Sequence, residues 1–264
     1  MIWLLLCPLV IWGFAVCVMA ATQRRFLYLP GTAEPDPHKA AAPWMHPVAR
    51  TEGGILGWWT PPPSEDGLVL LYFHGNRGTL ARIAAKTAPW LNDMGIGLFA
   101  ATYRGYEGNP GQPTEPGLYQ DGRAALDWLD AQGISRKRLV IYGESLGSAV
   151  ATKLAVCEPL AGLVLEAPFT NIADMAAARY PLLPARRLVR DRFDNAARIA
   201  AISCPILILH GDQDRTTPVC HSDRLAKLGQ DNLDLIKIKG AGHLDIHSHG
   251  GTLALKAFLA RIKR

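Results

Sequence analysis

A serine flanked by glycines stands between a strand-like and a helix-like segment near the middle of the chain. Residues 139–142 are β-branched, aliphatic or aromatic, residues 143–147 read Gly-Glu-Ser-Leu-Gly, and residues 148–154 have a helix-like composition. A sharp strand-to-helix turn forces Ser145 into strained backbone angles, and positions 143 and 147 must then lack side chains that would clash. The pattern predicts a serine hydroxyl exposed at the end of a strand.

Apolar strand-like runs alternate with helix-like stretches through the rest of the chain. The expected strands are 56–59, 68–73, 97–101, 139–142, 163–166, 205–209 and 233–238. The expected helices are 79–92, 118–131, 146–156, 219–228 and 252–262. Such alternation predicts a mostly parallel sheet, and strand cores that are almost entirely apolar predict that helices cover both of its faces. Residues 32–47, rich in proline and alanine, are expected to be an irregular connector.

A serine hydroxyl becomes a nucleophile when a base removes its proton and an anionic partner orients that base. Asp214 follows a strand-like run in a polar turn and is the expected acid, with Asp212 as the main alternative and Glu166 as a more distant one. His243, on a glycine-rich loop after the last predicted strand, is the expected base. The order Ser145, Asp214, His243, each after a strand, is the order of the α/β-hydrolase fold.

The oxyanion formed when Ser145 attacks a carbonyl needs two backbone N–H donors, and losing one costs about 3 kcal/mol. The N–H of Leu146, directly after the serine, is the first expected donor. The second is assigned to the N–H of Asn76, because the strand-like run 68–73 leads directly into the glycine-containing turn 74–78. A neighbouring amide of that turn is the alternative.

Six motifs together resemble one group of hydrolases. They are His-Gly-Asn at 74–76, Tyr-Arg-Gly-Tyr at 103–106, Gly-Glu-Ser-Leu-Gly at 143–147, Leu-Glu-Ala-Pro-Phe at 165–169, His-Gly-Asp-Gln-Asp at 210–214 and Gly-His at 242–243. From about Phe26 to its C-terminus the chain resembles the membrane-tethered, bud-emergence-related and depalmitoylase-like subgroup of α/β-hydrolases. The resemblance implies serine hydrolase activity and a short lid. Two turns, 107–109 and 216–218, depart from the subgroup's pattern without touching the triad.

Residues 2–21 contain no charged side chain. At about 1.5 Å per residue, a helix of this length spans the roughly 30 Å hydrocarbon core of a bilayer. We therefore expect a single-pass anchor over residues 1–23 and a catalytic domain over residues 24–264. Arg24 and Arg25 follow the span, and the positive-inside rule then favours a cytoplasmic catalytic domain.

A cleaved signal peptide is the alternative to the anchor. Val-Met-Ala at 18–20 resembles a cleavage site, although no Lys or Arg precedes the apolar region. Cleavage would leave a secreted or periplasmic domain.

The alternation of strands and helices stops over residues 169–202, which we call the lid. Our hypothesis is that the lid covers Ser145 with an apolar acyl pocket. Four side chains would line it: Met175, Tyr180, Leu182 and Leu183. Three arginines would face anionic lipid head groups: Arg186, Arg187 and Arg190. The alternative is an ordinary surface excursion that packs its own leucines.

Charge and metal-ligand patterns argue against other classes of function. The net charge is +5, but Lys and Arg are dispersed and not interleaved with aromatic residues, so no nucleic acid is expected as a partner. His243, Asp245, His247 and His249 lie close in sequence, yet their glycine-rich surroundings and the role of His243 argue against a metal site. We expect no metal and no cofactor, and we expect His247 and His249 to face solvent.

The expected function is hydrolysis of acyl esters or thioesters through an acyl-enzyme on Ser145, because a membrane anchor would hold the site near lipid-like substrates. The expected partners are therefore a lipid-like acyl substrate and a membrane. A serine peptidase on the same fold is the first alternative. A non-catalytic scaffold that binds a lipid or a protein partner is the second. The sequence does not specify an oligomeric state.

Overall fold

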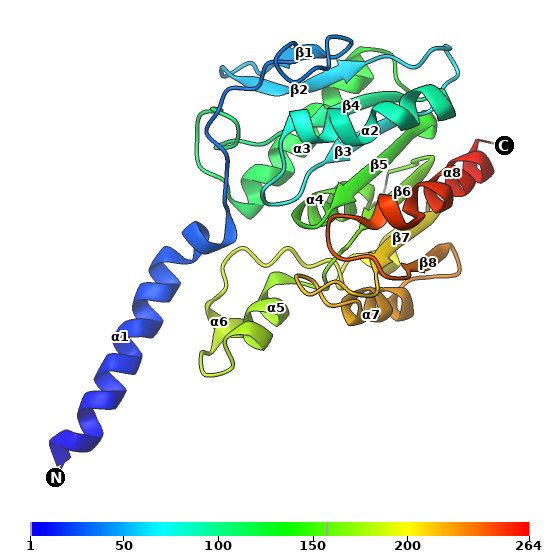
Figure 1. The fold of residues 1–264 in the computed structure, drawn as a ribbon. Coiled ribbons are helices and arrows are strands. Elements are labelled where there is room, and N and C mark those ends of the chain that lie inside the picture. Colours follow the sequence, from blue (N-terminus) through cyan, green and yellow to red (C-terminus); the bar gives the residue numbers. More distant parts are fainter. Residues whose placement is uncertain (1, 157, 264) are drawn as a thin grey trace.

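The computed structural model describes residues 2–156 and 158–263. Its centre is an eight-stranded sheet in the order β1-β2-β4-β3-β5-β6-β7-β8 (Figure 1). The strands are β1 (His46–Ala49), β2 (Ile55–Thr60), β3 (Val69–Phe73), β4 (Gly97–Ala101), β5 (Leu139–Glu144), β6 (Gly162–Glu166), β7 (Ile206–Gly211) and β8 (Leu233–Ile238). β2 is antiparallel to β1 and β4, and all other neighbouring pairs are parallel. The predicted mostly parallel sheet is confirmed.

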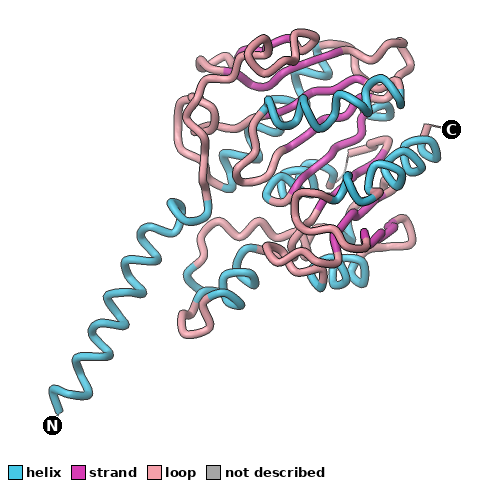
Figure 2. The backbone as a smooth tube through the Cα atoms, in the orientation of Figure 1, coloured by secondary structure: helices cyan, strands magenta, loops and turns pink. Residues whose placement is uncertain are grey.

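Helices cover both faces of this sheet (Figure 2). Those that flank the sheet are α2 (Leu80–Met94), α3 (Glu115–Ala131), α4 (Leu146–Ala155), α7 (Cys220–Leu228) and α8 (Gly251–Ile262). Side chains of α3, α4 and α7 pack on one face and those of α2 and α8 on the other. Every residue of β3 to β7 is buried, as strands covered on both faces require.

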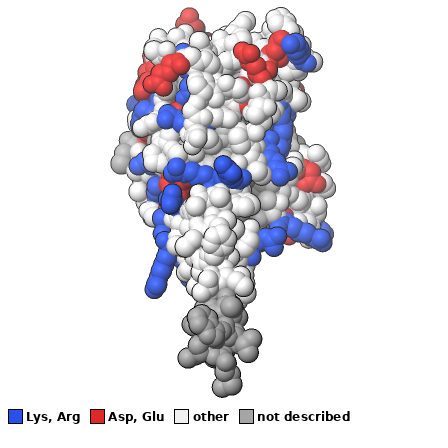
Figure 3. All heavy atoms as spheres, turned by 90° about the vertical axis from the view of Figure 1, so that its left-hand side faces the viewer, with Lys and Arg blue, Asp and Glu red and all other residues white. Residues whose placement is uncertain are grey.

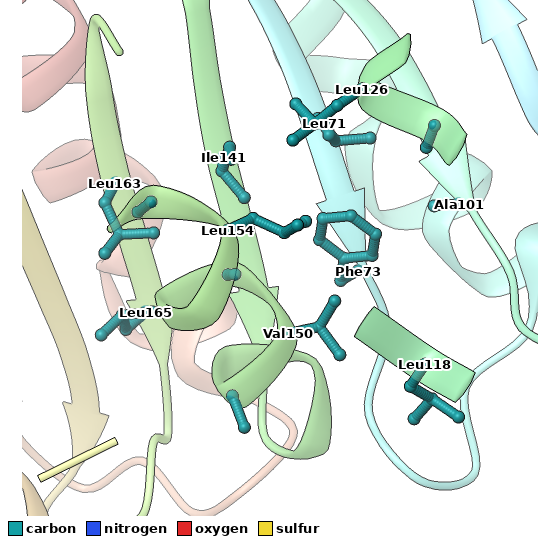
Figure 4. Close-up of a cluster of buried hydrophobic side chains, with 14 of the residues drawn as sticks. Leu71, Phe73, Ala101, Leu118, Leu126, Ile141, Val150, Leu154, Leu163 and Leu165 are labelled. Atoms are coloured by element: carbon teal, nitrogen blue, oxygen red, sulfur yellow. The ribbon is translucent and has the colours of Figure 1, made fainter. Parts of the chain in front are cut away.

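The packing of α4 against the sheet fixes the position of the segment that begins with Ser145. Phe73 of β3 faces Val150 and Leu154 of α4 (Figure 4). α3 approaches this cluster closely at Gly122, where an added Cβ would lie 2.7 Å from a methyl carbon of Leu154. Burying each such apolar side chain stabilises the fold by about 1.5–3 kcal/mol, so the start of α4 rests on a rigid base.

One segment differs from the sequence expectation. The connector 32–47 was expected to be irregular, but its last two residues belong to β1, which pairs antiparallel with β2 at the edge of the sheet. β1 is only four residues long and has a single buried side chain, Val48. Its sequence therefore lacks the alternation of apolar and polar residues that would have predicted a strand.

The N-terminal helix α1 (Ile2–Leu27) extends away from the sheet (Figures 1 and 2). Its window Val10–Leu27 is long and apolar enough to cross a membrane, by length and composition, and contains no buried residue. The lid contains two short helices, α5 (Ile172–Arg179) and α6 (Ala185–Leu188), and the 3-10 turn η2 (Ile199–Ala201).

Candidate active site

Ser145 occupies the tight turn between β5 and α4. Its backbone angles, φ 50° and ψ −114°, lie in a region that residues with a side chain rarely adopt. Its flanking glycines are required by contact distances. A Cβ on Gly143 would lie 2.5 Å from the carbonyl oxygen of Gly147, and a Cβ on Gly147 would lie 2.1 Å from that of Phe73. The Ser145 N–H donates to the Glu166 carbonyl at 2.8 Å, which fastens the turn to the end of β6.

Ser145, His243 and Asp214 form a continuous chain of contacts. His243 Nε2 lies 3.1 Å from Ser145 Oγ, and His243 Nδ1 lies 2.6 Å from Asp214 Oδ2. The three residues follow β5, β8 and β7, whose parallel carboxyl ends meet at one edge of the sheet. Both distances suit proton transfer from the hydroxyl to the imidazole, with the carboxylate orienting the ring.

Asp214 is held as an ionised carboxylate. Its Oδ1 accepts the N–H groups of Thr216 and Thr217 at 2.8 and 2.9 Å, and His210 Nε2 lies 3.2 Å from Oδ2. Burial raises the pKa of Asp214, but hydrogen bonds from His210, His243 and the Thr217 amide outweigh burial and bring the pKa well below its usual range. A carboxylate that stays charged can stabilise an imidazolium on His243.

The two alternative acids lie elsewhere. Asp212 is exposed and its Oδ1 accepts the N–H of Gly240 at 2.8 Å, so it joins the turn after β7 to the turn after β8. Glu166 is completely buried beneath the turn of Ser145, where its carboxylate contacts Lys86 at 2.5 Å.

The amides expected to bind an oxyanion lie on segments next to Ser145. Leu146 is the first residue of α4, where a helix leaves its N–H groups without intrahelical acceptors. Asn76 lies in the turn after β3, and a Cβ on its neighbour Gly75 would lie 3.2 Å from Ser145 Cβ. Within residues 2–156 and 158–263, neither the Leu146 nor the Asn76 amide donates a hydrogen bond.

The side chain of Asn76 helps to fix the turn after β3. Its Oδ1 accepts the Leu29 N–H at 2.8 Å and the Tyr106 hydroxyl at 3.0 Å. The chain leaving α1 is thereby joined to the turn that carries the expected oxyanion donor.

A cavity of about 510 Å³ lies between α1, the lid and the turn after β7. Of the four side chains expected in an acyl pocket, Met175, Tyr180 and Leu183 line it. Leu182 does not, and its side chain is 83% exposed. Ser145 and His243 are also absent from the lining, so the cavity lies beside the serine and not directly over it.

Sequence reasoning missed the contribution of α1 to this cavity. Met19, Gln23, Phe26 and Leu27 line it, as does Ala20. Their spacing places them on one face of a helix. This spacing is the sequence signal that could have shown that one face of α1 packs against the rest of the protein.

His247 was expected to face solvent, and this prediction is wrong. Its side chain is 13% exposed, its Nε2 lies 2.9 Å from the Tyr142 hydroxyl, and its ring packs 4.5 Å from that of Trp90. The turn η3 (Ile246–His249) directs it inward, toward Glu166 at 3.3 Å.

A buried charged network that the sequence did not reveal lies beneath Ser145. Lys86 of α2 contacts Glu144 at 2.9 Å and Glu166 at 2.5 Å. Tyr72 donates to Glu144 and Tyr142 donates to Glu166, at 2.7 and 2.5 Å. These contacts join α2 to the ends of β5 and β6. Among the described residues, no group of three or more His, Cys, Asp or Glu is arranged to hold a metal ion.

The chain has relatives among known proteins. The family described as serine aminopeptidase, S33, matches residues 64–197. An uncharacterized protein of Mycobacterium tuberculosis is 37% identical over 240 residues, covering 89% of this chain and 85% of the relative. Human alpha/beta hydrolase domain-containing protein 17B is 31% identical over 196 residues, covering 73% and 66%. An esterase structure from Pyrococcus furiosus superposes with a TM-score of 0.71 over 90% of this chain and 97% of its own, and its 17% identity supports the fold alone.

Proposed function

The chain belongs to the α/β-hydrolase superfamily and is a hydrolase. We propose that it cleaves acyl esters or thioesters with Ser145 as nucleophile, His243 as base and Asp214 as the carboxylate that orients His243 and stabilises its imidazolium form. The observation that carries this proposal is the unbroken contact from Ser145 Oγ through the imidazole of His243 to the Asp214 carboxylate.

The proposed mechanism uses the chain's own groups only. His243 Nε2 takes the Ser145 proton as Oγ attacks the carbonyl carbon, and the ionised Asp214 stabilises the imidazolium. The amides of Leu146 and Asn76 donate to the oxyanion. The imidazolium then protonates the leaving alcohol or thiol, and the acyl group stays on Ser145. His243 next takes a proton from a water whose oxygen attacks the acyl carbonyl, and it returns that proton to Ser145 Oγ as the acid leaves.

The surroundings of the site favour a lipid-like acyl substrate. The cavity beside the triad is lined mainly by apolar side chains of α1 and the lid. We propose that α1 anchors the protein in a membrane, which would place the cavity next to the lipid. Arg25 is exposed just after the uncharged stretch 2–21 and favours a cytoplasmic domain, whereas Arg24 is occupied by an ion pair with Asp191.

A serine peptidase is the second candidate, because the matching family is described as serine aminopeptidase. The two candidates share the triad and differ in the group that follows the carbonyl. A panel of acyl esters, acyl thioesters and aminoacyl amides separates them. We expect the highest kcat/KM on esters or thioesters, and a preference for amides would favour the peptidase.

Labelling with a fluorophosphonate probe tests the proposed nucleophile. The wild-type protein should react, because the probe captures an activated serine, and Ser145→Ala should not react while keeping its circular dichroism spectrum. Labelling that persists in the folded Ser145→Ala protein would show that another residue is the nucleophile.

A further inference from the structure

We propose that α1 forms one wall of the substrate site, so that the cavity between α1 and the lid receives the acyl chain of a lipid-like substrate directly from the membrane. This inference rests on the proposed function. It assigns α1 a role in substrate binding beyond anchoring.

The walls of the cavity come from three parts of the chain. α1 contributes the helix face that contains Met19, Gln23 and Phe26, while the lid contributes an apolar face from Ile172 to Val189. The turn after β7 closes the third side with Thr216 and Pro218. A volume of about 510 Å³ falls within the range of about 300–1,000 Å³ that small-molecule sites occupy.

Specific polar contacts hold α1 against the lid. Gln23 donates to the Leu188 carbonyl at 3.1 Å and accepts the Arg190 N–H at 2.8 Å. Arg24 pairs at 2.8 Å with Asp191, whose side chain is only 3% exposed. A helix that served only as a tether would not need a buried carboxylate and a paired amide to fix its rotation.

Two walls of the cavity lead directly to the proposed catalytic groups. Just beyond α1, the Leu29 N–H donates to Asn76, whose amide is the expected oxyanion donor. On the opposite side, the Thr216 N–H donates to the Asp214 carboxylate. The segments that form these walls are thus hydrogen-bonded to Asn76 and Asp214, the groups proposed to act on a carbonyl held at Ser145.

The lid also lies alongside the apolar part of α1. Trp12 Nε1 donates to the Leu182 carbonyl at 3.1 Å, and Trp12 precedes Leu27 by 15 residues, which is about 22 Å of helix. The exposed Leu182 side chain is thus beside the segment that can span a membrane. Figure 3 shows an uncharged column along α1 with Lys and Arg side chains on its flanks. An acyl chain in the bilayer could enter the cavity without crossing water.

Filling the cavity from the α1 side tests the inference. Ala20→Trp would place an indole in the cavity, whereas Ala21→Trp adds the same group at an exposed position outside the lining. Both are made in the full-length protein in lipid nanodiscs. For p-nitrophenyl esters, we expect Ala20→Trp to lower the ratio of kcat/KM for dodecanoate to that for acetate by at least tenfold. Ala21→Trp should keep the wild-type ratio.

A binding measurement separates this inference from the proposed function. In the Ser145→Ala background, Ala20→Trp should weaken binding of the fluorescent fatty acid cis-parinaric acid by at least tenfold, and Ala21→Trp should not. Ala176→Trp, which narrows the same cavity from α5, should act like Ala20→Trp and guards against misfolding of one variant. Loss of binding in Ala176→Trp alone, or equal effects of Ala20→Trp and Ala21→Trp, would remove α1 from the site. Ester hydrolysis that survives Ser145→Ala would instead overturn the proposed function.

Discussion

At the scale of single residues, the environment of Asp214 explains why its carboxylate orients His243, although His210 lies nearby as well. Two backbone amides occupy Oδ1 and leave Oδ2 facing His243 at 2.6 Å. His210 approaches the same oxygen at 3.2 Å, but its ring nitrogens also lie 2.7 Å from the Thr217 carbonyl and 2.6 Å from the Ser222 hydroxyl. These contacts fix the His210 ring, so His210 helps to hold the Asp214 carboxylate in place.

Replacing Asp214 by Asn should lower kcat/KM by about 10³-fold or more, because an amide cannot stabilise the imidazolium and favours the wrong tautomer of His243. The measurement is steady-state hydrolysis of a p-nitrophenyl ester. Asp212→Asn is the matched control, since the exposed Asp212 carboxylate accepts the Gly240 N–H, and it should keep kcat/KM within threefold. A larger loss in Asp212→Asn than in Asp214→Asn would reverse the assignment of the acid.

The placement of these three residues at one edge of the sheet could be predicted from the sequence because each follows its own strand. Ser145, Asp214 and His243 stand just past apolar runs, and parallel strands bring such positions to one edge. His247 was misjudged because its partners, Tyr142 and Glu166, lie 105 and 81 residues away in sequence. No local pattern reports contacts of that range.

At the scale of secondary structure elements, buried charges connect the segments that carry the catalytic groups. Glu144 precedes Ser145, and the Glu166 carbonyl holds the Ser145 amide. His247, four residues after His243, reaches the same Glu166. Lys86, whose side chain is only 14% exposed, pairs with both carboxylates, and Arg82 also pairs with Glu144 at 3.0 Å. Burial raises the pKa of Glu166, but Lys86 and His247 outweigh burial and bring it well below its usual range.

Lys86→Met should destabilise the protein by about 3–5 kcal/mol at pH 7, because the fully buried Glu166 loses its lysine partner while Glu144 keeps only Arg82. Glu166, with a lowered pKa, stabilises the wild type above its unfolded pKa of about 4.3. That contribution declines as the pH falls toward the folded pKa. The difference between wild type and Lys86→Met should therefore shrink below about pH 4.3, as measured by urea unfolding.

Lys153→Met is the control for this prediction, since Lys153 is exposed on α4 and makes no ion pair within the described part of the chain. It should change stability by less than about 0.5 kcal/mol. A Lys86→Met protein as stable as this control at pH 7 would contradict the role of the network.

The secondary structure elements differ in how well the sequence predicts them. β3 to β7 are buried along their whole length and were visible as continuous apolar runs. α1 was visible as an apolar span, but its docking on the lid depends on two contacts that form only in the folded chain. Gln23 accepts the Arg190 N–H, and Arg24 pairs with Asp191. Tertiary contacts of this kind decide where the cavity lies, and this is why the pocket was expected over Ser145 and is found beside it.

At the scale of the whole molecule, α1, the lid and the carboxyl ends of the strands lie on the same side (Figure 1). Membrane insertion of α1 would consequently bring the lid to the lipid surface. Arg187 and Arg190 are exposed there and make no ion pair within the described residues, whereas Arg186 pairs with Asp174 at 3.1 Å. Of the three arginines expected to face lipid head groups, two are thus free to do so.

Reversing the charge of these two arginines tests this orientation. Each Lys or Arg near an anionic surface contributes about 1 kcal/mol, so Arg187→Glu with Arg190→Glu should weaken lid contact with anionic lipid. We expect activity on a long-chain ester in phosphatidylserine-containing nanodiscs to fall at least tenfold, while activity on a soluble acetate ester changes less than twofold. Lys153→Glu with Lys256→Glu, at exposed positions on α4 and α8, is the matched control and should affect neither. Equal losses on both substrates would mean that the arginines act within the protein, and the lid would then not face the membrane.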